Sequence, residues 1–539
     1  MSAGSISGGT FRRWGAEAVA AASLVGFGFA FHRSALEGWW LFDDPQIVAH
    51  ARQFPWYEIM FLPSAWRWLS TSNFTPLVTL SFELDLMLGG LDPRVYYAHQ
   101  LSSALAAGLA LHAFLRALRV PVASSAMLAA AFLASPPMVE CVRSLMTRHY
   151  LEGSLLFLVA ANLWVRARTR AGLTAASALA LLAMLAKELF VPCFLGLLLI
   201  DRFRRLPRRE MAERALAVAA VVTLYTAWRF LALGGFGGYG PGLRTGSLPT
   251  PLDLISIFAG EPDAPWWALW LAALSFVVFR SRLRPRAAWS AAGAILLLGL
   301  VPILPVLRFP FPRYFYVLGL MIVVLFGLAH PLLGRRGGLL VPLALLVSSA
   351  GAGLQAARGA ELEAAAWERE GRWMLEGPPA PTLFESAHTL YLDGLRHLYL
   401  GPGSEPAHPV ALSTVVVQPE WPEMVRFRHG RMVKPTEHER VSPLDPSRSG
   451  LVLANRGGRY AWSLWPRGGD WRYVASPFGE AFAVEAEGSL RAPTSLWPPT
   501  REGEGWFRFA RRVERGWIVS PRLPLPQRGE AVRWGTIPE

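Results

Sequence analysis

A series of apolar runs, separated by short loops rich in arginine, constrains this chain more than any other feature. Several of these runs reach the length of about 20 residues that a helix needs to cross the core of a bilayer. Hydrophobic residues make up 53% of the chain and charged residues 17%, whereas soluble proteins carry about a quarter charged residues. The sequence therefore predicts an integral membrane protein, folded as an all-α polytopic bundle.

About eleven transmembrane helices are expected, some of them short or sharing their ends. They fall at residues 16–31, 96–115, 120–137, 149–166, 171–186, 189–201, 211–232, 265–280, 287–306, 314–332 and 338–354. The first run follows two arginines and ends without a convincing small-residue cleavage site. We interpret it as an uncleaved helix whose N-terminus is cytoplasmic.

The positive charge is distributed as membrane topology requires. The net charge is +14, and the chain has only two lysines, Lys187 and Lys434, so arginine supplies nearly all of it. Arginines cluster in alternate loops, for example at 202–209 and 280–286, which the positive-inside rule places in the cytoplasm. The charge supports no nucleic-acid partner, because there is no basic face or nucleic-acid-binding motif. We expect a bacterial inner-membrane protein with a periplasmic C-terminal part.

Two domains are expected: a transmembrane domain at 1–354 and an extracytoplasmic domain, α+β or β-rich, at 355–539. The first extracytoplasmic loop covers 37–95. Its segments 46–54 and 57–69 resemble short interfacial helices, with Trp56, Trp66 and Trp68 at the level of the headgroups. Beyond 355, the sequence predicts an amphipathic helix at 361–375 and strands at 410–417, 459–464, 481–487 and 506–511.

Two adjacent carboxylates, Asp43 and Asp44, follow the first apolar run in the sequence LFDDP at 41–45. A carboxylate can accept the proton of a hydroxyl group, so these two residues are candidates for a catalytic base. The alternative is a solvated loop or a helix N-cap before Pro45.

Further charged residues lie within or beside apolar runs, where ionisable groups are costly and are functional candidates. Glu140 and Arg148 flank a short extracytoplasmic turn, and Lys187 with Glu188 interrupts the apolar run 175–200. The alternatives are a helix-packing salt bridge for the first two and a local ion pair for the second two.

Arg308 and Arg313 lie in the aromatic segment RFPFPRYFY at 308–316. Arginine beside tyrosine at a membrane surface suits bidentate recognition of phosphate. The alternative is an ordinary aromatic belt with a snorkelling arginine. The predicted topology places the following residues on or near the extracytoplasmic side of the membrane: Asp43, Asp44, Glu140, Arg143, Arg148, Lys187, Glu188 and Arg313.

No metal site is expected. The two cysteines, Cys141 and Cys193, have no CxxC spacing, and the histidines show no metal-ligand spacing.

In this order, the motifs resemble those of the transmembrane O-mannosyltransferases that carry TPR repeats. The matching segments are FDD at 42–44, TPL at 75–77, LGGLDP at 88–93, PPMVECV at 136–142 followed by Arg148, AKE at 186–188 and RYFY at 313–316. Together they cover about half of the chain, roughly residues 38–330. The resemblance implies a GT-C fold, a polyprenyl-phosphate-linked sugar donor and inversion at the anomeric carbon.

The resemblance also implies roles for individual residues. Asp43 would be the catalytic base and Asp44 its partner, and Glu140 would be a second acidic group. The donor phosphate would be held by Arg148, Lys187 and Arg313, and the matching motifs add Glu188 and Tyr316 to the substrate-binding set. No cofactor is implied beyond the lipid-linked sugar, and the acceptor would be a protein or a glycan.

The chain also departs from the family's pattern. Thr75 stands in place of an arginine, Ser135 in place of a histidine, and Tyr97 and Gln100 in place of a histidine and an asparagine. The TPR tail is absent. Two alternatives to a transferase therefore stay open: a lipid-linked-sugar flippase or O-antigen polymerase-like protein, and a non-catalytic envelope protein.

Overall fold

The computed structural model describes residues 8–70, 73–235, 270, 293–294, 298–300 and 312–376, and parts of the remainder. These parts are 382–384, 389–400, 409–411, 425–428, 431–433, 441–456, 459–467, 471–475, 482–484, 487–491, 506–513, 516–521, 523–524, 526 and 529–536. The chain forms two compact units. The helical unit comprises Met1–Gly38, Phe74–Leu231 and Leu243–Glu361, and the mixed unit comprises Trp39–Asn73, Ala232–Gly242 and Leu362–Glu539. The expected loop 37–95 is therefore divided between the two units. Residues 39–73 belong to the mixed unit, with the C-terminal residues, and the rest of the loop belongs to the helical unit.

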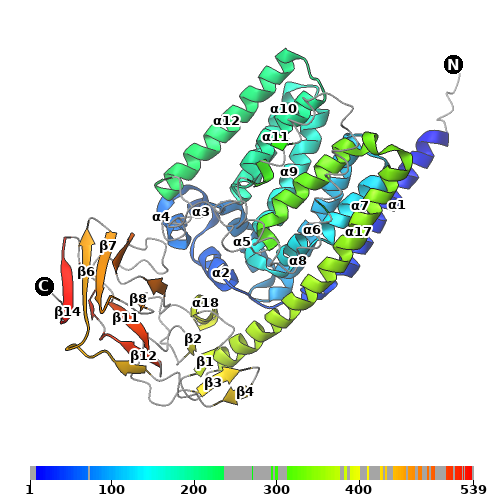
Figure 1. The fold of residues 1–539 in the computed structure, drawn as a ribbon. Helices are drawn as coiled ribbons and strands as arrows, with labels where there is room; N and C mark the ends of the chain where they lie inside the picture. The colour runs from blue at the N-terminus through cyan, green and yellow to red at the C-terminus, as the bar shows by residue number, and fades with distance from the viewer. Residues whose placement is uncertain are drawn as a thin grey trace. The chain divides into compact units, whose positions relative to one another are not determined.

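The helical unit is built from long helices joined by short loops (Figure 1). Its helices are α1 (Gly8–His32), η1 (Arg33–Glu37), α5 (Pro76–Gly89), α6 (Pro93–Ala117), α7 (Val122–Leu133), α8 (Pro136–Arg143), η2 (Leu145–Thr147), α9 (Arg148–Arg166), α10 (Arg170–Ala186), α11 (Phe190–Phe203), α12 (Arg208–Leu233), η4 (Pro312–Phe315) and α17 (Tyr316–Glu376), whose last residues belong to the mixed unit. Because the loops after α6, α9 and α11 are short, successive helices run antiparallel, and α9 packs against both α6 and α10.

Most of the expected spans coincide with helices. The exceptions are 265–280 and 287–306, which lie almost wholly outside the described residues, and 120–137, which is divided between α7 and α8 at a bend of 56°. Within the described residues, four helices are long and apolar enough to cross a membrane, or five if α7 and α8 form one span. The expected number of eleven is therefore not confirmed.

Two arginines close helices in a backbone conformation that usually belongs to glycine. Arg119 follows α6 with a φ of 67°, and Arg205 follows α11 with a φ of 60°. In each turn the arginine N–H bonds a carbonyl three residues back, and the next N–H bonds one five residues back, at 2.9 to 3.2 Å. Both are Schellman turns, which satisfy carbonyls that the helix end leaves unpaired.

The helices that lie wholly in the mixed unit are short. They are α2 (Asp44–Gln53), α3 (Trp56–Phe61), α4 (Pro63–Leu69) and α18 (Thr389–Leu400), and the end of α17 also belongs to this unit. Helix α2 packs against α18 and α4. The expected helix 57–69 is broken because Leu62 is extended and Pro63 begins a new helix.

Of the tryptophans expected at the headgroup level, Trp56 is 52% exposed, whereas Trp66 is 1% exposed. The expectation for Trp66 is wrong. Its indole N–H donates to the carbonyl of Asn73 at 2.8 Å, and its ring meets the His50 ring edge-on, so that it packs inside the unit.

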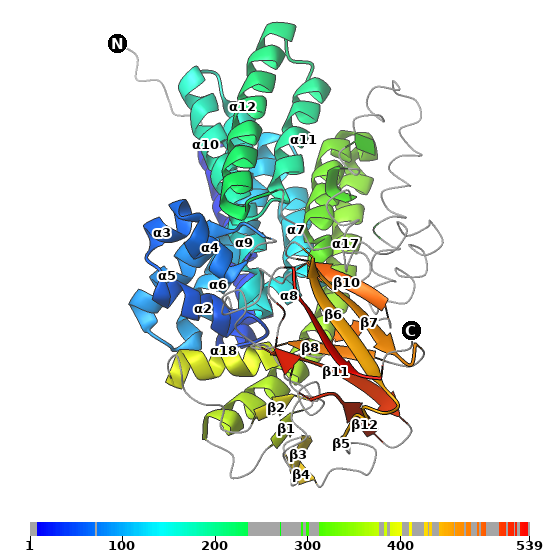
Figure 2. The same cartoon turned by 90° about the vertical axis from the view of Figure 1, so that its left-hand side faces the viewer.

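Among the described residues of the mixed unit, most that lie outside the helices form short strands (Figure 2). They are β1 (Thr382–Phe384), β2 (Pro409–Ala411), β3 (Val425–Arg428), β4 (Arg431–Val433), β5 (Val441–Pro443), β6 (Gly450–Arg456), β7 (Arg459–Trp465), β8 (Trp471–Ala475), β9 (Phe482–Val484), β10 (Glu487–Arg491), β11 (Trp506–Val513), β12 (Gly516–Val519), β13 (Leu523–Pro524) and β14 (Ala531–Gly535). They form sheets in the orders β2-β1-β3-β4, β10-β7-β6-β14 and β5-β12-β11-β8-β9, with β13 beside β11.

Alternate residues of β6 and β7 enter one buried cluster with residues of β8 and β11, as two packed sheets require. The cluster is Leu444, Leu451, Leu453, Trp462, Leu464, Trp471, Phe509 and Leu523. Of the expected strands, 459–464 and 506–511 lie on β7 and β11, 481–487 overlaps β9 and the start of β10, and 410–417 lies mostly outside the described residues.

Candidate functional site

The two adjacent carboxylates lie at the start of α2, in different surroundings. Asp44 is fully buried, and its Oδ2 accepts a hydrogen bond from the Leu41 backbone N–H at 2.8 Å. Asp43 is exposed and occupies the N-cap position, where its carbonyl accepts from the Ile47 N–H at 3.1 Å. Its side chain makes no capping hydrogen bond, so the N-cap role falls to the backbone alone. Asp44 therefore fixes the turn, and Asp43 is the exposed residue of the pair.

Phe42, directly before this pair, has a φ of 46°. A bulky residue rarely adopts a positive φ, and such strain, of order 1–3 kcal/mol, clusters at functional sites. The Phe42 ring lies 4.6 Å from the Trp367 ring, centroid to centroid. The strained turn is thus held by packing within the mixed unit.

Glu140 and Arg313 form a two-point contact between α8 and η4 in the helical unit. The Arg313 backbone N–H donates to Glu140 Oε2 at 2.8 Å, and the Arg313 Nη1 donates to Glu140 Oε1. The guanidinium also lies over the Tyr314 ring, 5.3 Å from its centroid. The carboxylate fixes the direction of a guanidinium that is 8% exposed at its side chain.

Lys187 and Glu188 lie in the turn between α10 and α11, and Arg229 of α12 lies beside this turn. Glu188 pairs with Lys187 at 3.6 Å through Oε1 and with Arg229 at 3.5 Å through Oε2. Burial alone would raise the pKa of Glu188, but the charges of these two neighbours lower it below its usual range. The turn therefore holds two cations around one ionised carboxylate.

His149 lies at the start of α9, in the same region of the helical unit as both groups. It lies within electrostatic range of both Lys187 and Arg313. The cluster formed by Glu140, Arg313, Lys187, Glu188 and Arg229 contains three cations and two carboxylates, a net charge of +1. It occupies the end of the helical unit where α9 and α11 begin and α10 and α12 end. We call it the cationic cluster.

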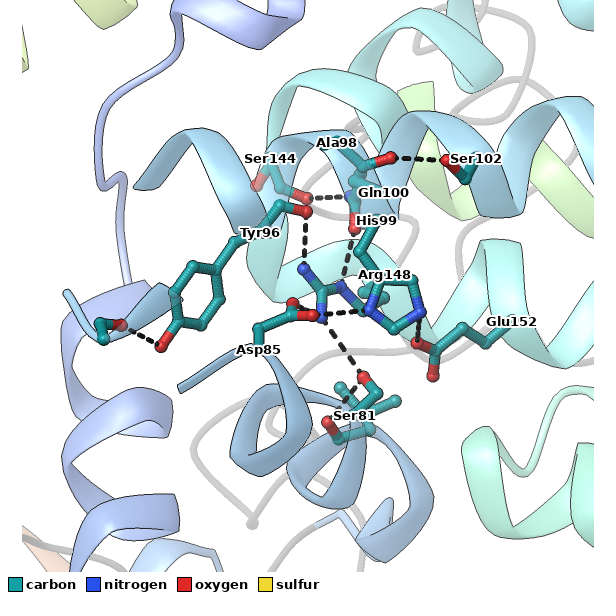
Figure 3. A network of polar contacts seen from close by, with 12 residues as sticks. Ser81, Asp85, Tyr96, Ala98, His99, Gln100, Ser102, Ser144, Arg148 and Glu152 are labelled. Atoms are coloured by element: carbon teal, nitrogen blue, oxygen red, sulfur yellow. Dashed lines mark hydrogen bonds and ion pairs between the residues drawn. The ribbon is translucent and has the colours of Figure 1, made fainter. Parts of the chain in front are cut away.

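Arg148, whose side chain is fully buried, is the centre of a separate polar network (Figure 3). Its guanidinium pairs with Asp85 of α5 and donates to the Tyr96 carbonyl at 2.7 Å, Gln100 Oε1 at 3.0 Å and Ser81 Oγ at 3.3 Å. Arg148 thus joins α5, α6 and α9, and its donors are directed at protein acceptors.

Two further side chains extend this network. The His99 Nδ1–H donates to Asp85 at 2.7 Å, and its Nε2 lies 3.6 Å from Glu152 (Figure 3). The Gln100 amide donates to the carbonyls of Cys141 and Ser144, which places the α8 end against α6. The network therefore links four helices, α5, α6, α8 and α9, through polar contacts.

Tyr316, at the start of α17, is buried in an aromatic group. Its hydroxyl lies 2.8 Å from Ser154 Oγ, and its ring contacts those of Phe132 and Tyr150. This hydroxyl already has a partner on α9.

The structure brings some of the expected residues together. Glu140 meets Arg313, and Lys187 meets Glu188, all in the helical unit. Asp43 and Asp44 belong to the mixed unit, so their predicted convergence with the other residues stays a prediction. Arg308 lies outside the described residues.

The sequence analysis missed Asp85, Arg229 and His149. Asp85 lies in α5 with one other charged residue, Glu83, and Arg229 is the only charged residue in the apolar part 215–233 of α12; ionisable residues in such apolar segments are functional candidates. His149 adjoins Arg148 in the sequence and had no such signal. Among the residues that the structure describes, no three His, Cys, Asp or Glu side chains are arranged to hold a metal ion.

No protein-family model matches the sequence, and no curated protein matches it. Among solved structures, the chain is similar to ArnT from Cupriavidus metallidurans bound to undecaprenyl phosphate, with 13% identity, a TM-score of 0.43, and coverage of 77% of this chain and 91% of that one. It is similar to the same protein in the apo state, with 14% identity, a TM-score of 0.43, and coverage of 75% and 92%. The function of this chain therefore has to be argued from its own residues.

Proposed function

We propose that this chain is a membrane glycosyltransferase of the GT-C type, which moves a sugar from a polyprenyl-phosphate donor to an acceptor hydroxyl with inversion. The observation that carries the proposal is the cationic cluster at one end of an apolar helical unit. A lipid-linked sugar places its phosphate where an apolar core meets water. Arginine and lysine are the side chains that hold phosphate there.

In this proposal the cluster binds the donor phosphate and stabilises it as it leaves. Arg313 is oriented by Glu140, and Lys187 and Arg229 by Glu188, so the cations are positioned before the donor binds. Preorganised charges of this kind stabilise charge that develops in a transition state. The net charge of the cluster is +1 and favours an anion.

Asp43 is the proposed base. The acceptor oxygen attacks the anomeric carbon, the bond from that carbon to the phosphate oxygen breaks, and the hydroxyl proton passes to the Asp43 carboxylate. Asp43 accepts the proton because it is exposed. Asp44, which is buried and hydrogen-bonded to the backbone, positions the turn that carries Asp43. This step requires Asp43 to lie near the cationic cluster, which is part of the proposal.

Arg148 and Tyr316 contribute to substrate binding in this proposal by holding α9, which carries His149 beside the cluster. The resemblance to O-mannosyltransferases motivates the hexose and an acceptor on protein or glycan. The N-terminus is cytoplasmic, and the mixed unit is periplasmic in a bacterial inner membrane. The arginine-rich turns after α6, α9 and α11 motivate this orientation.

The test uses the full chain in nanodiscs with radiolabelled polyprenyl-phosphate sugars and extracts of envelope glycans and proteins as acceptors. We expect label to pass to an acceptor, and Asp43→Asn to reduce the rate by about 10² to 10⁴, the usual contribution of a general base. Asp445→Asn is the matched control, because Asp445 is an exposed carboxylate in the same unit.

Two outcomes would refute the proposal. One is an Asp43→Asn variant as active as the Asp445→Asn control. The other is transport of the labelled lipid across a vesicle membrane without any transfer, which would favour the flippase alternative.

A further inference from the structure

We propose that the end of α17, residues 362–376, and α18, residues 389–400, are part of the catalytic site, and that Trp367 and Tyr391 are positioning residues for Asp43. This inference rests on the proposed function for its consequence in catalysis. Its structural part stands on contacts within the mixed unit alone.

Aromatic rings connect α18 to the residue before the carboxylates. Phe42 packs on Trp367 with ring centroids 4.6 Å apart, and Trp367 packs edge-on against Tyr391 at 4.8 Å. Tyr391 and Trp367 are 0% and 2% exposed. Because Phe42 is in a strained conformation, this packing has to favour the native turn over its relaxed alternatives.

Hydrogen bonds fix the same rings in orientation. The Trp39 indole N–H donates to the Tyr391 hydroxyl at 3.1 Å, and that hydroxyl donates to the Trp367 carbonyl at 3.2 Å. The Trp40 indole N–H donates to the Tyr399 hydroxyl at 3.0 Å. Two consecutive tryptophans before the Asp43–Asp44 turn are thus bonded to two tyrosines of α18.

α18 also lies directly against the residues after Asp44. A Cβ added to Gly394 would lie 3.2 Å from Pro45 Cβ and 3.1 Å from Gln46 Cγ, so only glycine permits this approach without adjustment. One turn further along, the Arg52 Nη1 donates to the Leu398 carbonyl at 3.2 Å. The turn is therefore held on both sides by a segment about 350 residues away in the chain.

In this arrangement, the C-terminal part of the mixed unit positions a catalytic group. Misplacing a catalytic group by about 1 Å can reduce the rate about a hundredfold. We infer that α18 keeps the Asp43 carboxylate in the position that proton transfer needs. Its loss would lower turnover without changing how the donor lipid binds.

The first test is Tyr391→Phe, which removes the hydroxyl and keeps the ring. We expect kcat to fall about tenfold to a hundredfold, KM for the donor to stay within about twofold, and amide hydrogen exchange at residues 41–47 to accelerate. Tyr57→Phe is the control, because Tyr57 is an exposed tyrosine in the same unit. A purely structural role would lower the thermal stability and leave the kcat of the folded fraction unchanged.

The second test is Gly394→Ala, which pushes α18 away from Pro45, with Gly359→Ala as the control because a Cβ there meets nothing within 4 Å. Faster exchange at 41–47 in Gly394→Ala alone supports the structural inference even if no sugar transfer is found. Unchanged exchange in both Tyr391→Phe and Gly394→Ala would overturn it. Faster exchange with unchanged kcat would overturn the positioning role and leave the proposed transferase intact.

Discussion

Breaking the ion pair between Arg148 and Asp85 should destabilise the helical unit more than any exposed substitution. Both side chains are buried, at 0% and 1% exposure, and Asp85 also accepts from His99. Removing one partner of a buried pair leaves an uncompensated charge and costs about 3–5 kcal/mol. We expect Asp85→Ala and Arg148→Met each to lie in this range, which raises the unfolded fraction at least a hundredfold.

The double variant should be less destabilised than the sum of the two single variants, because neither charge is then left alone. We expect a coupling energy of about 2–3 kcal/mol, at the upper end for residues in contact. The free energy of unfolding would be measured by titration with SDS from mixed micelles, and binding of undecaprenyl phosphate by the folded fraction would be measured in parallel.

Two results would refute this reasoning. Additive effects of the single variants would show that the pair is not a coupled buried contact. An Arg148→Met variant that folds with normal stability but loses lipid-phosphate binding would assign Arg148 to the donor site itself.

Three further predictions follow from individual contacts. Gly353→Ala should cost about 1–3 kcal/mol of stability, because the new Cβ would lie 2.0 Å from the Ala134 carbonyl oxygen, whereas Gly351→Ala, with nothing within 4 Å, should be neutral or slightly stabilising in the same unfolding titration. Burial lowers the pKa of His50 from 6.5 to about 4. The unfolded chain therefore takes up a proton before the folded one as the pH falls, and about 3 kcal/mol of stability should be lost between pH 6.5 and pH 4; a His50→Gln variant whose stability falls equally over this range would contradict this. Glu188→Gln removes a negative charge between two cations, raises the net charge of the cationic cluster from +1 to +2, and keeps a side-chain oxygen that can hold Lys187 and Arg229. Binding of polyprenyl phosphate should tighten about tenfold in a titration, and unchanged binding would argue against a phosphate at this turn.

Much of the helical unit was predictable because apolar length and proline position are local signals. The apolar run 96–115 predicted a helix, and α6 covers it, beginning at Pro93 with Asp92 Oδ1 accepting from the Arg94 N–H. The partner of Arg148 was not predictable, since Asp85 is 63 residues away and either residue has many candidates.

The same limit applies to the mixed unit. The helix α18 itself was predictable from the sequence. Its buried face shows the i, i+3, i+4, i+7 spacing of a helix, at Tyr391, Gly394, Leu395 and Leu398. This face packs against Pro45, about 350 residues earlier in the chain. No local sequence pattern predicts a contact between segments so far apart. Trp66 was misplaced because aromatic residues near a membrane suit both headgroups and a small core.

The two Schellman turns closed by Arg119 and Arg205 have a consequence for how the chain enters the membrane. A non-glycine residue at a positive φ lowers the free energy of unfolding by about 1 kcal/mol relative to glycine. In the proposed orientation both turns face the cytoplasm, where each guanidinium opposes translocation of its hairpin during synthesis. In that orientation, the two arginines direct insertion at a small cost in folded stability. Glycine at both positions would then give a protein that is more stable once inserted but that inserts more often in the wrong orientation.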